Sequence, residues 1–187
     1  MGKPLNSAGN YSKALLDVGI ATWDEFLDWI WNLPYGRHAN RGQFMEVITE
    51  GKGTCSSKHA LALLVASENN IPGVQLILGM VKMNEKTIPG IGNGIAELGL
   101  EYIPEAHCYL KLHGQRVDLT FPNQVFRFAE QDVVLEQEIQ AIDAVENKNK
   151  IHHQFLHRWI SQNGVQFSLD HIWRVREECI AKLSQQY

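Results

Sequence analysis

Apolar residues recur at helical spacing near the start of the chain. Thr22 is followed three residues later by Glu25, which is the pattern of a capping box. Phe26 and Ile30 then continue along one helix face. Pro34 is expected to end this helix, because proline cannot donate a backbone hydrogen bond.

The next segment is apolar on nearly every side. A short helix is expected to stop at Gly51, and Thr54 then offers a cap for a longer helix that carries Cys55 at its start. Residues 59–66 are almost entirely apolar, which predicts a helix that is buried all round, and Asn69 follows its end. A cysteine at the polar start of a buried helix is therefore a candidate for chemistry.

Period-two patterns predict strands in the middle of the chain. Residues 74–83 form one expected strand, and residues 106–112 and 115–120 alternate around Gly114 as the arms of a hairpin do. Residues 84–104 are rich in glycine and lack the spacing of a phosphate-binding loop. We expect this segment to be an irregular loop, and a candidate lid over the start of the cysteine helix.

From residue 126 onward the pattern is helical. Residues 130–146 hold six acidic side chains and no basic ones, whereas Lys148 opens a stretch of basic residues and histidines. We expect these charges to lie on solvated helix faces of opposite sign. Ser168 is expected to cap the last helix. The order of elements predicts an α+β fold in a single domain, residues 1–187.

Composition and charge narrow the function. The 187 residues are 44% hydrophobic and carry a net charge of −4, which disfavours a dedicated nucleic-acid binder. Three cysteines, an odd number, favour a reducing compartment over a disulfide framework. The longest apolar run, residues 60–66, is too short to span a membrane. We therefore expect a soluble cytoplasmic protein that binds neither nucleic acid nor membranes.

Cys55 is the first candidate for a catalytic residue. The partial positive charge of a helix N-terminus stabilises a thiolate, and the unpaired backbone N–H groups there can donate to an oxyanion. Alternatively, Cys55 is simply a small buried residue. Its position in the sequence does not by itself decide between these two interpretations.

His107 and Asp118 supply the base and the orienting carboxylate that a cysteine nucleophile needs. If His113 and Gly114 form the hairpin turn, the two side chains lie diagonally on one face of the hairpin, within reach of each other. A turn with an odd number of residues would place them on opposite faces. Each residue alone also fits an ordinary strand position, so the combination with Cys55 carries the hypothesis.

These residues resemble the transglutaminase-like superfamily over roughly residues 23 to 122. The blocks that carry the resemblance are Gly-Thr-Cys at 53–55, Asn-Ile-Pro-Gly-Val at 70–74, Glu-Ala-His-Cys-Tyr at 105–109 and Arg-Val-Asp-Leu-Thr at 116–120. The resemblance implies a papain-like core at 12–125, with a cysteine helix packed on an antiparallel sheet, followed by a helical extension at 126–187.

The resemblance also implies a mechanism. Cys55 would be the nucleophile, His107 its base and Asp118 the residue that orients the imidazole. The activity would be that of an amide hydrolase or acyltransferase, of protease, deamidase or transglutaminase type, with no metal or cofactor. The substrate would be a protein, a peptide or a small amide. The family usually has a bulky aromatic residue, often tryptophan, shortly after the histidine, whereas here Cys108 follows His107 directly and Tyr109 comes next. No calcium-binding loop of the animal transglutaminase kind is recognisable either.

The side chain that completes the oxyanion hole stays open at this point. It is expected upstream of Cys55, and nothing in the sequence selects among the four polar candidates there. These candidates are Trp31, Asn32, Tyr35 and Asn40.

Three weaker alternatives remain. The chain could be an inactive transglutaminase-like domain that binds a protein through its acidic segment. His59 could be a local base or a co-ligand one turn after Cys55. Lys58 could add positive charge near the sulfur, but it fits a surface lysine better. A zinc site could also be built from nitrogen and sulfur ligands. The residues that suggest zinc are Cys55 with His59, His107 and Cys108 with His113, and His153 with His157.

Overall fold

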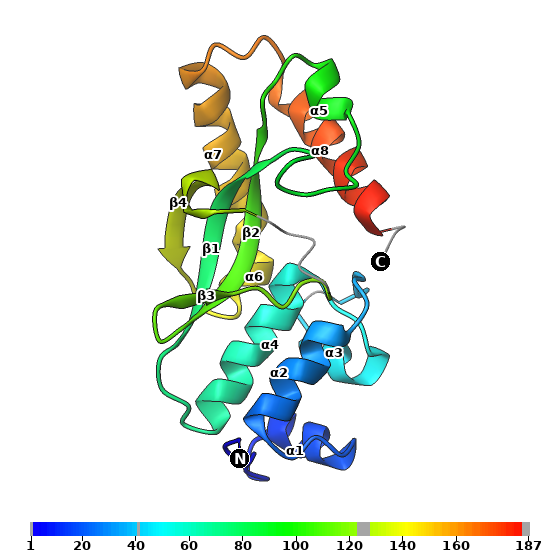
Figure 1. Cartoon of the computed structure of the whole chain (residues 1–187), viewed down its shortest axis with the longest axis vertical. Coiled ribbons are helices and arrows are strands. Elements are labelled where there is room, and N and C mark those ends of the chain that lie inside the picture. Colours follow the sequence, from blue (N-terminus) through cyan, green and yellow to red (C-terminus); the bar gives the residue numbers. More distant parts are fainter. Residues whose placement is uncertain (1, 41, 123–127, 185–187) are drawn as a thin grey trace.

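A computed structural model describes residues 2–40, 42–122 and 128–184, and it has an α+β architecture. Four antiparallel strands form one sheet in the order β3-β2-β1-β4 (Figure 1). The helices and strands are α1 (Asn10–Asp17), α2 (Trp23–Asn32), α3 (Met45–Glu50), α4 (Cys55–Glu68), β1 (Val74–Met83), α5 (Gly94–Glu97), β2 (Ile103–Leu112), β3 (Gln115–Val117), β4 (Val133–Glu138), α6 (Asp143–Glu146), α7 (Lys148–Gln162) and α8 (Leu169–Ser184). Within these described ranges, no helix has both the length and the apolar character that crossing a membrane requires.

The predicted hairpin is confirmed, although its second arm is shorter than expected. β2 pairs with β3 so that Leu112 faces Gln115, and the turn consists of His113 and Gly114. Both turn residues have positive φ angles, 50° and 83°, as in the two-residue turns that match the twist of a hairpin. The even length of this turn keeps residues 107 and 118 on one face of the hairpin, as the sequence analysis required.

The buried cysteine helix is also confirmed. Thr54 caps α4, and its hydroxyl accepts a hydrogen bond from the backbone N–H of Ser57. α4 packs against β2 and is covered elsewhere by α1, α2 and α3, which explains why its sequence is apolar on every side (Figure 1). The helix thereby carries Cys55 to a position near the middle of the molecule.

The C-terminal part differs from the expected run of helices. Residues 126 and 127, where that run was expected to begin, lie outside the described residues. Residues 133–138 form the edge strand β4 instead of a helix, because they pair with β1. On this strand Glu136 accepts hydrogen bonds from Tyr109, Lys111 and Arg116, so one of the six acidic side chains is part of the sheet.

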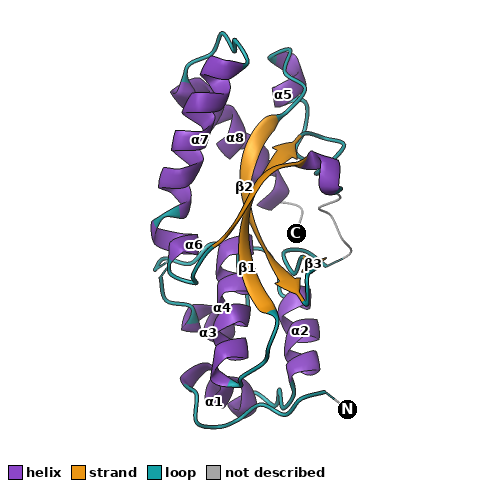
Figure 2. Ribbon diagram, turned by 90° about the vertical axis from the view of Figure 1, so that its left-hand side faces the viewer, coloured by secondary structure: helices purple, strands orange, loops and turns teal. Residues whose placement is uncertain are grey.

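The start of the last helix agrees with the prediction. α7 ends at Gln162, and α8 begins after Ser168, whose hydroxyl accepts a hydrogen bond from the backbone N–H of His171. α6 and α7 extend along the same side of the sheet as α4 (Figure 2). A buried cluster formed by residues of α5, α7 and α8 with the adjacent ends of β1 and β2 makes a second core beside the one around α4.

The glycine-rich segment is not a lid over the start of α4. Ile88, Ile91 and Ile95 from this segment are buried in the second core, where α5 packs against α8. The glycines indicated a loose loop, but these three isoleucine side chains pack the segment into the core. The expectation of a lid was therefore wrong.

Candidate active site

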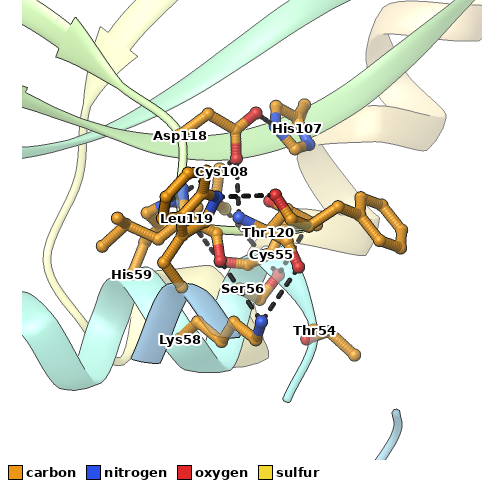
Figure 3. Close-up of polar contacts among 12 residues, drawn as sticks. Thr54, Cys55, Ser56, Lys58, His59, His107, Cys108, Asp118, Leu119 and Thr120 are labelled. Carbon is orange, nitrogen blue, oxygen red and sulfur yellow. Dashed lines mark hydrogen bonds and ion pairs between the residues drawn. The ribbon is translucent and has the colours of Figure 1, made fainter. Parts of the chain in front are cut away.

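Cys55, His107 and Asp118 come from α4, β2 and the residue after β3, and the fold brings them into one site (Figure 3). The Nε2 atom of His107 lies 2.6 Å from Oδ2 of Asp118, and the side chain of His107 is 1% exposed. The second oxygen of Asp118, Oδ1, accepts a hydrogen bond from the backbone N–H of Thr120 at 2.9 Å. Both oxygens of the carboxylate are therefore fixed.

The charges in this pair stabilise each other. Burial alone lowers the pKa of His107, but Asp118 and the Cys55 thiolate outweigh it and raise this pKa to about 10. Burial raises the pKa of Asp118, but the His107 imidazolium and its hydrogen bond outweigh that effect and lower the pKa to about 2. At neutral pH the pair is an imidazolium and a carboxylate.

Cys55 is the first residue of α4 and is 7% exposed. A hydrogen bond from the Cys108 thiol lowers the pKa of Cys55 well below its usual range, despite burial, and Lys148 and His107 lower it further. The same contact and burial raise the pKa of Cys108, so Cys108 keeps its proton and acts as the donor. Ser56 lies between the two sulfurs, with its Oγ 4.0 Å from Sγ of Cys55 and 3.7 Å from Sγ of Cys108.

Lys148 is a part of this site that the sequence analysis missed. Its Nζ lies 3.2 Å from Sγ of Cys55 and 3.0 Å from Oγ of Ser56, and the residue is only 9% exposed. Burial lowers the pKa of Lys148, but the Cys55 thiolate outweighs it and raises this pKa above its ordinary value. The expectation of a solvated helix face is therefore wrong for Lys148. No local pattern distinguishes it from its neighbour Lys150, because its partner lies 93 residues away.

His59 and Lys58 hold the segment that carries Asp118. Nε2 of His59 accepts a hydrogen bond from the backbone N–H of Leu119 at 2.7 Å, and Nδ1 lies 2.7 Å from the carbonyl oxygen of Cys55. Because Nε2 accepts, Nδ1 carries the proton, and burial lowers the pKa of His59 to about 4. His59 is thus neutral, and both ring nitrogens are occupied by backbone groups.

Lys58 is fully buried, so the expectation of a surface lysine was wrong. Its ammonium donates to three backbone carbonyl oxygens, those of Leu33 at 2.6 Å, Thr120 at 2.9 Å and Leu119 at 3.3 Å. These bonds join the end of α2 and the segment after β3 to the first turn of α4. Lys58 therefore has a structural role next to the site.

A polar cavity of about 80 Å³ opens onto Cys55 and Lys148. Arg176 of α8 and Glu105 of β2 line it and form a buried ion pair, with Nε of Arg176 2.6 Å from Oε2 of Glu105. The described side chains of α7 and α8 thus supply part of the wall. The cavity suits a small polar group better than a bulky apolar one.

Of the four upstream candidates for an oxyanion donor, Tyr35 lines the cavity. Its ring stacks on Phe121, with 4.9 Å between centroids, and burial raises the pKa of its hydroxyl to about 12. The other three side chains donate elsewhere. Trp31 donates to the carbonyl of Phe121, Asn32 to that of Asp28, and Asn40 to the carboxylate of Glu46.

The residues that suggested zinc do not assemble into a site of three ligands. In the part of the chain that the structure describes, one group of histidine, cysteine or acidic side chains has the spacing of a metal site, and it consists of His38, Glu46 and Glu50. His153, in contrast, packs against the ring of Trp173 at 3.9 Å between centroids.

No protein-family model matches this chain, and no curated protein or solved structure is significantly similar to it.

Proposed function

We propose that this protein is a cysteine-dependent amide hydrolase or acyltransferase, with Cys55 as the nucleophile, His107 as the general base and acid, and Asp118 as the orienting residue. The observation that carries the proposal is the position of the Cys55 sulfur. It lies at a helix N-terminus, beside a buried ammonium and near a buried histidine that is paired with an aspartate. Each of these groups favours a thiolate, and a thiolate is the nucleophilic form of cysteine.

The arrangement fits a papain-like core of the transglutaminase-like kind. In support, the nucleophile starts a buried helix that packs on an antiparallel sheet, and the histidine and aspartate follow on a hairpin in that order. A role as an inactive binding module explains less, because it does not require a buried ammonium in contact with the cysteine.

The chemistry proceeds in two halves. The Cys55 thiolate attacks the amide carbonyl, and a carbon–sulfur bond forms. The His107 imidazolium then protonates the leaving amine as the carbon–nitrogen bond breaks, which leaves a thioester and a neutral imidazole. Neutral His107 next removes a proton from water or from an acceptor amine, which attacks the thioester. The carbon–sulfur bond breaks, and the thiolate and the imidazolium are restored.

Lys148 completes this proposal as the donor to the oxyanion. Two of its ammonium hydrogens have acceptors on Cys55 and Ser56, and the described residues offer no acceptor for the third. The oxyanion forms on the atom next to the carbon that binds Sγ, so it lies within reach of this hydrogen and of the backbone N–H groups at the start of α4. The small polar cavity favours a primary carboxamide or a similarly small acyl group as the part of the substrate that enters.

Acylation by an activated ester tests the proposal. Incubation with p-nitrophenyl acetate at pH 6 is expected to place one acetyl group on Cys55, as read by intact mass and peptide mapping. Cys108 and Cys179 should remain free, because both are buried and their pKa values are raised.

The variants Asp118→Asn and Lys148→Met should each slow this acylation by at least about tenfold, through the loss of charge next to the thiolate and the oxyanion. His157→Gln, which changes an exposed histidine, is the matched control and should react at the wild-type rate. If Cys55 is inert at pH 6, or reacts no faster than an unperturbed thiol, the protein is not an enzyme of this class and a binding role is indicated.

A further inference from the structure

We propose that His38, Glu46 and Glu50 form a binding site for a divalent transition-metal ion, with Zn²⁺ as its best probe. The site lies beside the catalytic cavity and is independent of the thiol chemistry. His38 lies in the connection between α2 and α3, and the two glutamates belong to α3. An imidazole with two carboxylates is a ligand set that such ions accept, with an open position for water.

The buried imidazole is the first observation. His38 is 7% exposed, and among the residues that the structure describes neither of its ring nitrogens meets a partner in hydrogen-bonding geometry. Buried polar atoms are nearly always satisfied, and an unsatisfied one costs stability. Oε2 of Glu46 is also buried and accepts no hydrogen bond from the described residues. Two potential ligand atoms therefore lie near each other, and neither has a hydrogen bond within the described part of the chain.

The spacing is the second observation. Nδ1 of His38 lies 3.5 Å from Oε2 of Glu50 and 3.8 Å from Oε2 of Glu46, and the three atoms all lie within 4.8 Å of one another. Ligands around a tetrahedral Zn²⁺ ion are about 3.4 Å apart, because each bond is about 2.1 Å long. Small side-chain movements are enough to close the site.

The charges on α3 are the third observation. Glu46 and Glu50 are four residues apart on one helix face, where like charges repel. Glu50 also stands at the last residue of the helix, where the dipole disfavours a negative charge. A cation between the two carboxylates removes both penalties.

Lys52 now supplies part of that positive charge. Its Nζ lies 2.8 Å from Oε2 of Glu50, and its side chain is 38% exposed and free to swing into solvent. The ammonium therefore competes with a metal ion for the same oxygen. Asn40 donates to the other oxygen of Glu46 at 3.3 Å, which leaves Oε2 of Glu46 facing the imidazole.

The expected effect of the ion is to fasten one wall of the catalytic cavity. His38 and its neighbour Arg37 line that cavity, whereas α3 packs against the first core. A metal bridge from His38 to α3 holds this connection in place, so binding should raise the melting temperature. The ion takes no part in the chemistry proposed for Cys55.

Equilibrium dialysis of the full chain against Zn²⁺ at pH 7.5 tests the proposal. The Cys55→Ser background removes the reactive thiolate as a competing ligand. One tightly bound ion per chain is expected, with a rise in melting temperature. Glu50→Gln should weaken binding by more than about tenfold, whereas Lys52→Met should strengthen it severalfold, because it removes the competing ammonium.

Two exposed substitutions serve as matched controls. Glu97→Gln and Lys150→Met change the same kinds of charge elsewhere on the surface and should leave Zn²⁺ affinity unchanged. The proposal is overturned if no ion binds. It is equally overturned if Glu50→Gln and Lys52→Met leave the affinity unchanged, because the ion then lies elsewhere. Neither result bears on acylation of Cys55, which is measured separately.

Discussion

The two buried histidines beside Cys55 carry different charges because their partners differ. His107 faces a carboxylate and holds two protons, whereas His59 accepts a hydrogen bond from a backbone N–H and holds one. His152 in α7 is also buried and neutral, since burial lowers its pKa to about 4. One site therefore combines an imidazolium with a proposed role in catalysis and a neutral imidazole that holds the backbone.

The neutral histidines predict a loss of stability in mild acid. The unfolded chain protonates His59 and His152 near pH 6.5, whereas the folded chain does so near pH 4. The contribution of these two histidines to the free energy of unfolding is therefore full above pH 6.5 and is lost as the pH falls toward 4. The raised pKa of His107 acts in the opposite window, because its contribution is full below pH 6.5 and is lost as the pH rises through about 10.

Urea unfolding at pH 7, 6 and 5 measures this effect. We expect the free energy of unfolding to fall across the series, and His152→Gln to make the fall shallower. His157→Gln, at an exposed position of the same helix, should leave the slope as it is in the wild type. A flat profile between pH 7 and pH 5 contradicts the assignment of neutral, buried histidines.

At the scale of the elements, the first turn of α4 has two tasks. It presents Cys55 to the cavity, and it also binds the backbone that carries Asp118. Lys58 donates to the carbonyls of Leu119 and Thr120, and His59 accepts from the N–H of Leu119. The same turn of helix therefore positions both Cys55 and Asp118, the proposed nucleophile and orienting carboxylate.

Lys58→Met is expected to destabilise the protein by about 3 kcal/mol, because three buried carbonyl oxygens lose a charged donor. The variant should also lower the rate at which Cys55 reacts, since the segment with Asp118 loses its anchor. Thermal unfolding and iodoacetamide labelling measure the two effects. Lys150→Met is the control for an exposed lysine, and an equal effect of the two substitutions refutes the anchoring role.

At the scale of the whole molecule, α7 and α8 complete the site that α4 and the sheet begin. α7 contributes Lys148, and α8 contributes Arg176, which pairs with Glu105 on β2. The two helices therefore do more than cover the core. They supply positive charge to a cavity whose other wall carries Cys55, the proposed nucleophile.

The buried pair predicts a large effect from a single substitution. Arg176→Met should destabilise the protein by about 3–5 kcal/mol, because Glu105 is then left charged and unpaired in a buried position. The double variant with Glu105→Gln should recover much of this loss. Chemical denaturation of the single and double variants measures both.

The exposed pair of Arg37 and Glu177, 3.2 Å apart, is the matched comparison. Arg37→Met should cost less than about 1 kcal/mol, since a solvated ion pair contributes little. If the two arginine variants lose equal stability, burial is not what makes the Arg176 pair important.

Local patterns predicted the central part of the fold. The capping residues and apolar run located α4, and the residues His113 and Gly114 fixed a turn of even length that brings His107 and Asp118 together. These features depend on neighbours in the sequence, and for that reason they could be read from it.

Contacts between distant segments could not be predicted in this way. β4 is an acidic edge strand whose pairing with β1 leaves no local signature, so it resembled a solvated helix. Lysine is usually a surface residue, so the sequence gives no sign that Lys148 and Lys58 are buried. Only the assembled fold shows that each is buried against a specific partner. His107 and Asp118 could be paired from the sequence because the hairpin that joins them is a local structure. The contact between Lys148 and Cys55 could not, because 93 residues separate them.

The separation between Cys55 and Lys148 has a consequence for protein synthesis. The lysine leaves the ribosome 93 residues after the cysteine, so a nascent chain can form α4 and the hairpin before α7 exists. During that interval the thiol lacks the neighbouring ammonium, which is one of the groups that lower its pKa in the folded chain. The proposed nucleophile therefore acquires its full set of neighbouring charges only after α7 has been synthesised.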